Sequence, residues 1–209
     1  MTTAWALSVT TYHLLSDAAS LRELKRELQH AVPDPSVPAS PETLESLPFL
    51  TACIKEGLRL SYGVTARLSR VSPDQDLMLV GEDESWRVPA GTPVSMQSVL
   101  IHRNARLFPS PSEFVPKRWL DNKSLDRYLV SFSKGSRQCV GINIAYAELY
   151  TVLASVFRVY GSVDAKGDGD VGSLALYDTT KRDVEIVGDS NVPIIDRRSK
   201  GIRVRVGDA

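Results

Sequence analysis

Apolar residues recur along this chain mainly at the spacing of helices. They return every three or four positions over residues 4–15, 21–30, 49–60 and 142–157. That spacing places apolar side chains on one face of a helix, which can then pack against a core. The pattern therefore predicts four helices of several turns, separated by segments in which the periodicity is lost.

Helix-start signals refine two of the boundaries. Ser20 followed by Glu23 predicts a capping box at the start of the second helix, which ends near His30. Ser40 followed by Pro41 predicts an N-cap with proline at the first helical position, opening one further short helix.

Short runs with glycine and proline punctuation predict small strands. They lie at Thr65–Val71, Leu77–Val80, Trp86–Val88, Pro93–Met96, Leu174–Val187 and Ile202–Val206. Residues 104–131 lack periodicity and are rich in proline, aspartate and serine, so we expect a functional loop or a linker there. Asp164–Asp170 is acidic but lacks the ligand pattern of an EF-hand loop, and we interpret it as a polar turn. The predicted fold class is mainly α with small β-sheets.

Composition narrows the classes of function. The chain has 209 residues, 43% of them hydrophobic and 24% charged, which is enough for one or two globular domains. Its formal net charge is +0, so the charge balance does not indicate binding to nucleic acid or to an anionic membrane. We expect no apolar run to reach the length of a membrane span, and Met1–Leu15 lacks the basic region of a signal peptide. The two cysteines, Cys53 and Cys139, favour a reducing compartment over a disulfide framework.

The most specific pattern in the chain is Phe132–Gly141, which reads F-x-x-G-x-R-x-C-x-G and runs directly into the last predicted helix. A lone cysteine is most often a small buried hydrophobe. Cys139, however, stands where a helix begins, and the backbone N–H groups and dipole of a helix start favour a thiolate. With its four companions at fixed spacing, Cys139 does not fit that interpretation.

This stretch resembles the heme-ligand loop of the cytochrome P450 family. The resemblance implies that Cys139 is the axial ligand of the iron of heme b, where a thiolate pushes electron density onto the metal. Arg137 would meet a heme propionate, and Phe132 would cover the sulfur from water. Gly135 would permit a turn that a Cβ would obstruct, and Gly141 would let the helix pass close to the porphyrin.

A second motif lies upstream of the cysteine loop. Glu56 and Arg59 match E-x-x-R, a spacing that puts both side chains on neighbouring turns of one helix face. Alone, this would be an ordinary surface pair. Phe114–Trp119 is similar to the family pattern F-x-P-E-R-F/W, and the resemblance implies that Arg118 joins Glu56 and Arg59 as a structural triad. Lys117 stands where the family has an acid, so the sequence does not predict the local ion pair of that acid.

The beginning of the chain resembles the end of the family's oxygen-activating motif, A/G-G-x-D/E-T-T. Thr2 would match the threonine that assists proton delivery to dioxygen, although Met1 stands in place of the acid. The alternative is that two threonines at this position carry no function. Arg70 matches a position that contacts a heme propionate, and a solvated strand arginine is the alternative. We interpret His102 as a structural core residue, because no second ligand stands at ligand spacing from it.

The resemblance covers nearly the whole chain but less than half of a complete family member. It implies that residues 1–209 are the C-terminal, heme-binding portion of a cytochrome P450 domain of fungal type, with the N-terminal part absent. The implied function is a heme-thiolate monooxygenase that inserts one oxygen atom of dioxygen into a small organic substrate. Electrons would come from NADPH through a flavin-containing reductase.

Two alternatives stay open. The chain could be a truncated, non-catalytic family fragment that at most binds heme or a partner, or a helical interaction module with a chance cysteine loop. Family members are often anchored to the endoplasmic reticulum on its cytoplasmic side, but the sequence shows no anchor and gives no location.

Overall fold

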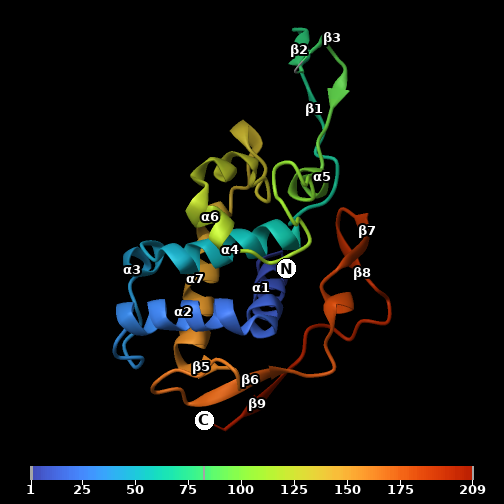
Figure 1. Cartoon of the computed structure of the whole chain (residues 1–209). Coiled ribbons are helices and arrows are strands. Elements are labelled where there is room, and N and C mark those ends of the chain that lie inside the picture. Colours follow the sequence, from blue (N-terminus) through green and yellow to red (C-terminus); the bar gives the residue numbers. More distant parts are fainter. Residues whose placement is uncertain (1, 82, 209) are drawn as a thin grey trace.

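The computed structural model describes residues 2–81 and 83–208. Within these residues, four long helices that lie across one another form the centre of the fold (Figure 1). They are α1 (Thr2–Ser16), α2 (Ala18–Ala31), α4 (Pro48–Ser61) and α7 (Ile142–Val159). The four helices that the apolar spacing predicts are thus confirmed.

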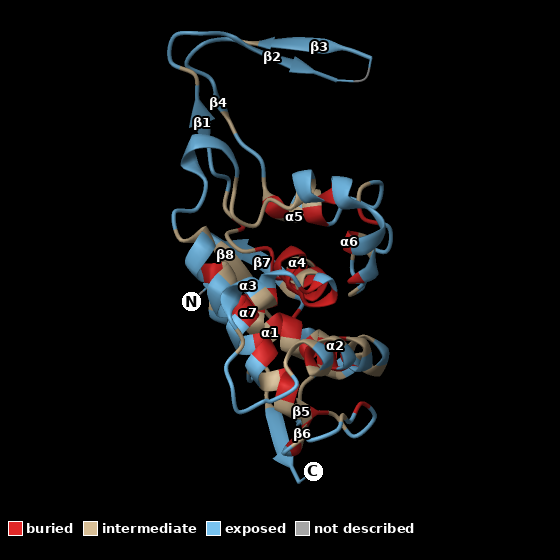
Figure 2. Ribbon diagram, turned by 90° about the vertical axis from the view of Figure 1, so that its left-hand side faces the viewer, coloured by how far each residue is buried: buried red, intermediate tan, exposed pale blue. Residues whose placement is uncertain are grey.

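Apolar side chains from all four of these helices make one core. Its fully buried members include Leu14, Leu24, Leu50, Ile54, Leu149, Leu153 and Phe157. Figure 2 shows that buried residues are concentrated where these helices meet. Each such side chain is worth about 1.5–3 kcal/mol when it leaves water, so the helix contacts are a main source of stability.

The start of α2 differs from the prediction. The N-cap is Asp17, whose Oδ1 accepts the N–H of Ala19 at 3.0 Å, while Ser20 Oγ donates to Asp17 Oδ2 at 2.6 Å. The capping box predicted from Ser20 and Glu23 is therefore wrong. Aspartate is as good an N-cap as serine, and it begins the helix almost a turn earlier. The predicted cap of the short helix α3 (Pro41–Glu45) is confirmed, because Ser40 Oγ accepts the N–H of Thr43.

Helix α7 meets the length and composition criteria for a membrane span, so the expectation that no apolar run reaches that length is wrong. The criteria alone are weak evidence, since core helices also satisfy them. Leu149, Leu153 and Phe157 on one side of α7 are buried in the core beside the other helices. Packing against those helices accounts for the apolar character of this face.

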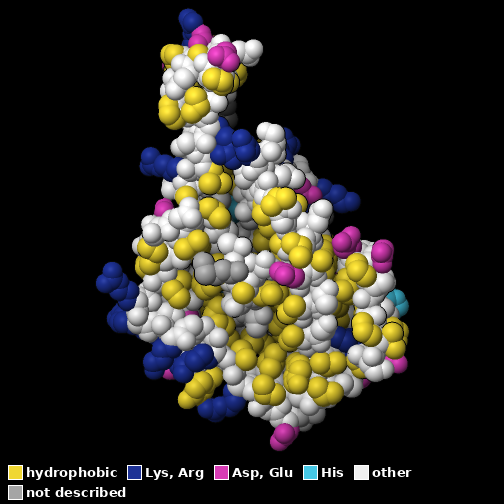
Figure 3. Space-filling view, turned by 180° about the vertical axis from the view of Figure 1, so that it is seen from behind, with side chains coloured by type: hydrophobic (Ala, Val, Ile, Leu, Met, Phe, Trp, Pro, Cys, Tyr) yellow, Lys and Arg dark blue, Asp and Glu magenta, His cyan; other side chains and the backbone are white. Residues whose placement is uncertain are grey.

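Two small sheets form an arm that extends from the helices (Figures 1 and 2). In the first, β1 (Arg70–Val71) pairs with β4 (Pro93–Val94), and in the second, β2 (Leu77–Val80) pairs with β3 (Ser85–Val88), all antiparallel. Most residues of the arm are exposed, and Figure 3 shows hydrophobic side chains on its surface. The strand predicted over Thr65–Val71 forms only at its last two residues.

Two further sheets follow α7. The first contains β5 (Tyr160–Gly161), β6 (Gly172–Leu176) and β9 (Val204–Gly207), with β5 and β6 parallel; in the second, β7 (Ile186–Ser190) pairs with β8 (Val192–Ile195). The single strand predicted over Leu174–Val187 is wrong, because the 3-10 helix η3 (Lys181–Asp183) interrupts it. Asp183 Oδ2 accepts the N–H of Thr180 at 2.8 Å in a capping box, which ends extended structure there.

Residues 104–131 are more ordered than a loop or a linker. The short helices in and around this segment are α5 (Ser98–His102), α6 (Lys117–Asp121), η1 (Lys123–Tyr128) and η2 (Gly135–Arg137). Phe108, Trp119 and Leu125 are buried together in a small second core against α4. The segment lacks periodicity because its apolar residues pack from irregular backbone as well as from helices.

The acidic turn predicted at Asp164–Asp170 has a structural use. Asp170 Oδ1 accepts a hydrogen bond from Lys25 Nζ at 2.6 Å, and both side chains are almost fully buried. Lys25 Nζ also donates to the carbonyls of Phe157 and Tyr160, both at 3.1 Å. This cluster ties α2 to the C-terminal end of α7 and to the turn.

Gly57 sets how closely α1 and α4 approach each other. A Cβ at this position would lie 1.8 Å from Thr10 Oγ1, and Thr10 is fully buried. We expect Gly57→Ala to lower the free energy of unfolding by about 1–3 kcal/mol, because the helices must separate to accept the methyl group. Gly188→Ala is the matched control, since a Cβ there would meet nothing within 4 Å. Equal midpoints of denaturant unfolding for the two variants would contradict the close crossing.

Candidate functional site

A buried carboxylate, Glu56, is the centre of the best-defined polar cluster. Oε1 accepts from Arg59 Nη2 at 2.8 Å, from the N–H of Val115 at 2.9 Å and from Arg118 Nε at 3.1 Å. Oε2 accepts from Arg59 Nε and from Trp119 Nε1, both at 2.9 Å. The side chain is fully buried, so these five hydrogen bonds replace water as the partners of its charge.

Arg59 uses every N–H of its guanidinium. Besides the two bonds to Glu56, Nη1 donates to the carbonyls of His102 at 2.9 Å and of Pro111 at 2.6 Å. Nη2 donates to the carbonyl of Glu113 at 2.9 Å. A planar fork with five donors suits this arrangement, whereas a lysine has three donors on one nitrogen.

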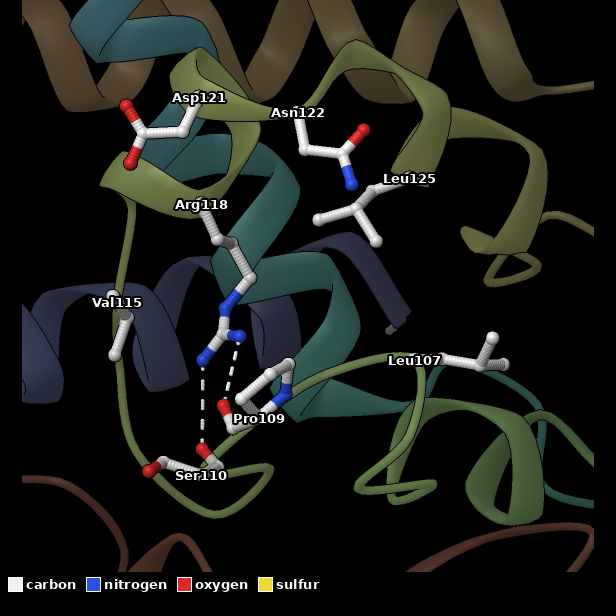
Figure 4. A pocket seen from close by; sticks show the side chains of 8 residues that line it. All are labelled: Leu107, Pro109, Ser110, Val115, Arg118, Asp121, Asn122 and Leu125. Carbon is white, nitrogen blue, oxygen red and sulfur yellow. Dashed lines mark hydrogen bonds between the residues drawn. The ribbon is translucent and has the colours of Figure 1, made fainter.

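Arg118 closes the cluster from α6. Its Nη1 donates to the carbonyl of Pro109 at 2.9 Å and its Nη2 to that of Ser110 at 3.5 Å. Figure 4 shows these two bonds at the side of a pocket that lies between the loop 107–115, α6 and η1. The structure therefore brings together the three residues that the motifs predict, Glu56, Arg59 and Arg118.

Lys117, which stands where the family pattern has an acid, forms an ion pair with α2. Its Nζ lies 3.1 Å from Glu23 Oε2 on α2, in a partly exposed ion pair. Phe114, in the loop just before α6, stacks on His13 of α1, with ring centroids 5.1 Å apart. Burial lowers the pKa of His13 to about 4. The loop is thus attached to α1 and α2 as well as to α4.

Sequence reasoning missed several members of this cluster. The motif includes Trp119 without indicating its role, and its indole N–H donates to Glu56 Oε2. The carbonyls of His102, Pro111 and Glu113 carry no sequence signal at all, because every residue has a carbonyl. The one related signal is the run of prolines and polar residues over 104–131, which is typical of backbone outside regular helices and strands.

The loop that carries Cys139 begins after η1 and ends at α7. The N–H of Cys139 donates to the carbonyl of Phe132 at 2.8 Å, which closes the loop on itself. Gly135 has φ +77°, a left-handed conformation that glycine adopts without strain. A Cβ on Gly135 would meet nothing within 4 Å, so the conformation and not crowding requires glycine in this structure. Phe132 packs beside Tyr146 of α7, with ring centroids 5.3 Å apart.

The two cysteines have opposite surroundings. Cys53 is buried in α4, and burial raises the pKa of its thiol well above the usual range. Cys139 is exposed and stands two residues before Gly141, the N-cap of α7. A Cβ on Gly141 would lie 3.8 Å from Cys139 Sγ, which places the sulfur beside the start of the helix. Only Cys139 is thus accessible to a ligand.

The other predicted site residues are not brought into this cluster by any described contact. Arg137 is exposed in the cysteine loop. Arg70 is exposed in the arm, where its Nη1 donates to the carbonyls of Leu68 and Ser69, both at 3.0 Å. Thr2 is exposed at the first residue of α1. Met1 lies outside the described residues.

Comparisons with known proteins place these motifs in context. A family model described as Cytochrome P450 matches residues 1–169. The cytochrome P450 monooxygenase tpcC of Cochliobolus heterostrophus is 52% identical over 99% of this chain and 40% of its own length. The cytochrome P450 monooxygenase astB of Talaromyces wortmannii is 47% identical over 99% of this chain and 43% of its own length. The N-acetyltryptophan 6-hydroxylase ivoC of Emericella nidulans is 38% identical over 99% of this chain and 38% of its own length. The chain thus spans about two fifths of the length of these curated relatives.

Removing Arg59 would leave the Glu56 charge buried without its main partner. We expect Arg59→Ala to lower the free energy of unfolding by about 3–5 kcal/mol, measured by denaturant titration. Lys55→Ala is the matched control on the same helix, because Lys55 pairs at 2.8 Å with Asp126, whose side chain is 53% exposed. An exposed pair of this kind contributes about 0–1 kcal/mol. Arg59→Ala protein as stable as Lys55→Ala protein would show that the cluster does not organise the fold.

Proposed function

Because the chain belongs to the cytochrome P450 family, we propose that it is the C-terminal, heme-binding portion of a monooxygenase of fungal type. The proposed reaction inserts one oxygen atom of dioxygen into a small organic substrate. The observation that carries the proposal is Cys139, an exposed thiol at the start of α7 within the family's ligand pattern. The names of the relatives, monooxygenases and a hydroxylase, agree with this class of reaction.

The residues around Cys139 fit a heme group. Val140, next to the cysteine, is fully exposed and Ile144 on the first turn of α7 is 65% exposed, so two apolar side chains are available to contact a porphyrin. Gly141 gives α7 no side-chain cap, and the positive end of the helix dipole at the first turn of α7 favours an anion beside it. Both features favour a thiolate ligand under an apolar ring.

We assign the residues of this chain the following work. Cys139 would hold the iron of heme b, and Arg137 would bind a propionate through its planar guanidinium. Phe132, packed against Tyr146, would keep water from the back of the sulfur. Gly135 provides the left-handed turn of the loop, and the cluster around Glu56 holds the segments from which the loop starts. When bound, heme supplies the iron on which dioxygen is activated.

Three further assignments rest on the motifs alone. Thr2 would assist proton delivery on the opposite face of the heme, Arg70 would bind a propionate, and Gly141 would let α7 approach the porphyrin. We also propose that electrons come from NADPH through a flavin-containing reductase. The competing proposal is a non-catalytic fragment that at most binds heme or a partner.

Ligation is tested by exchanging each cysteine separately. In the heme-loaded protein, Cys139→Ser should abolish the red-shifted carbon monoxide band of ferrous thiolate heme, because serine does not supply a thiolate. Cys53→Ala is the matched control and should keep the band, since Cys53 is buried in α4 away from solvent. Retention of the band in Cys139→Ser protein would exclude Cys139 as the ligand.

Coupling separates the monooxygenase from the non-catalytic alternative. We expect residues 1–209 alone to bind heme weakly and to consume NADPH without coupled product, because a heme site open to water admits proton leakage and side reactions. The measurement compares product with released hydrogen peroxide after addition of a reductase and NADPH. Coupled hydroxylation at about 1 per second or faster would contradict this expectation and favour a complete active site in these residues.

A further inference from the structure

His102 makes a polar contact that a core residue does not need. Its imidazole is fully buried at the end of α5, between the rings of Tyr62 and Phe108, each with a centroid 6.3 Å away. Nε2 accepts the backbone N–H of Val130 at 3.1 Å. Nδ1 is buried and has no hydrogen-bond partner among residues 2–81 and 83–208.

These contacts determine the tautomer of the ring. A backbone N–H can only donate, so Nε2 must be the unprotonated nitrogen and the proton of the neutral imidazole must be on Nδ1. Burial, with a smaller contribution from the charge of Arg59, lowers the pKa of His102 to about 3. The ring is therefore neutral at ordinary pH and keeps its acceptor.

The main chain of His102 makes a second connection. Its carbonyl accepts from Arg59 Nη1 at 2.9 Å, so one residue contacts both the Glu56 cluster and the segment at Val130. Tyr62 and Gly63, just after α4, have φ values of 61° and 63° and turn the chain there. A Cβ on Gly63 would lie 2.8 Å from the carbonyl oxygen of Ser131, which shows how tightly that segment is held.

Backbone hydrogen bonds connect the segment at Val130 with Cys139. The carbonyl of Val130 accepts the N–H of Ser133 at 2.9 Å, and the carbonyl of Phe132 accepts the N–H of Cys139 at 2.8 Å. Ser131 Oγ donates to the carbonyl of Leu58 on α4 at 2.9 Å. The backbone before Cys139 is thus fixed at its first residues, while the thiol end of the loop stays exposed.

We propose that His102 is a positioning residue for the cysteine loop. Its Nδ1–H tautomer binds the N–H of Val130 through Nε2 and so ties the start of the loop to Arg59 of α4. The part of the proposal that concerns heme rests on the proposed function of Cys139, whereas the hydrogen bond to Val130 does not. The unpaired Nδ1–H is a cost that a purely apolar side chain would avoid, which argues against a space-filling role.

The first test uses residues 1–209 without heme. Amide exchange of Val130, followed by NMR, should be on the order of tenfold faster in His102→Leu than in the unsubstituted protein, because one buried hydrogen bond is lost. His102→Gln is the matched variant, since its amide oxygen reaches the place of Nε2 and should restore the protection. The amide of Leu24 in α2 should be unchanged in both. Equal exchange of Val130 in the Leu and Gln variants would overturn the proposal.

The second test reads the tautomer directly. The ¹⁵N signal of Nε2 should be of the unprotonated, pyridine type and that of Nδ1 of the protonated, pyrrole type. A pyrrole-type signal at Nε2 would overturn the proposal even if His102→Leu does not fold.

The heme part is tested by titration of heme into the same three proteins. His102→Leu should bind heme at least several-fold more weakly and with less of the thiolate spectrum, and His102→Gln should recover both. Faster Val130 exchange without any change in heme binding would overturn the link to Cys139. Loss of the thiolate spectrum only in Cys139→Ser, with Val130 exchange unchanged there, would leave the hydrogen bond of His102 established independently.

Discussion

The charge of Glu56, buried in the middle of α4, is the constraint on which the surrounding structure depends. An isolated carboxylate in such a place would be very costly, and pairing with Arg59 alone leaves lone pairs and N–H groups unused. The structure satisfies them with backbone groups of His102 and of the segment 111–115, and with side chains of α6. The Glu56–Arg59 pair thereby fixes the positions of the irregular backbone segments that bind it. This role is distinct from a contribution to the net free energy of unfolding.

The helix core and the cysteine loop are connected through this constraint. The four long helices bury one apolar core, and Phe132 of the loop that carries Cys139 packs against it, while Ser131 of the same loop binds the carbonyl of Leu58 on α4. His102 and Ser131 attach its first residues, and Gly135 adopts a left-handed conformation within it. The other end of the loop joins the start of α7, which has no side-chain cap, and there the thiol of Cys139 is exposed to solvent. A base held by hydrogen bonds and an exposed tip suit the proposed role of Cys139 as the ligand of a large planar group.

The sequence predicted what depends on side-chain periodicity and motif spacing. The four long helices follow from apolar spacing, and the meeting of Glu56, Arg59 and Arg118 follows from the order of two motifs. Ser20 was a wrong cap because Asp17 competes for the same role, and the strand over Leu174–Val187 failed because Asp183 caps η3. Main-chain acceptors, and the tautomer of His102, depend on segments that meet only in the folded chain. Local sequence patterns therefore do not predict these acceptors or this tautomer.

The contrast between the two cysteines gives the protein a native attachment point. Cys53 is sealed in α4 as a thiol with a raised pKa, so it resists alkylation while the fold is intact. Cys139 is open to reagents at the start of α7. A thiol-directed spin label or fluorophore therefore modifies a single position without any engineered change in sequence. Such a label reports on whatever approaches that helix start, and modification of Cys53 signals that the core has opened.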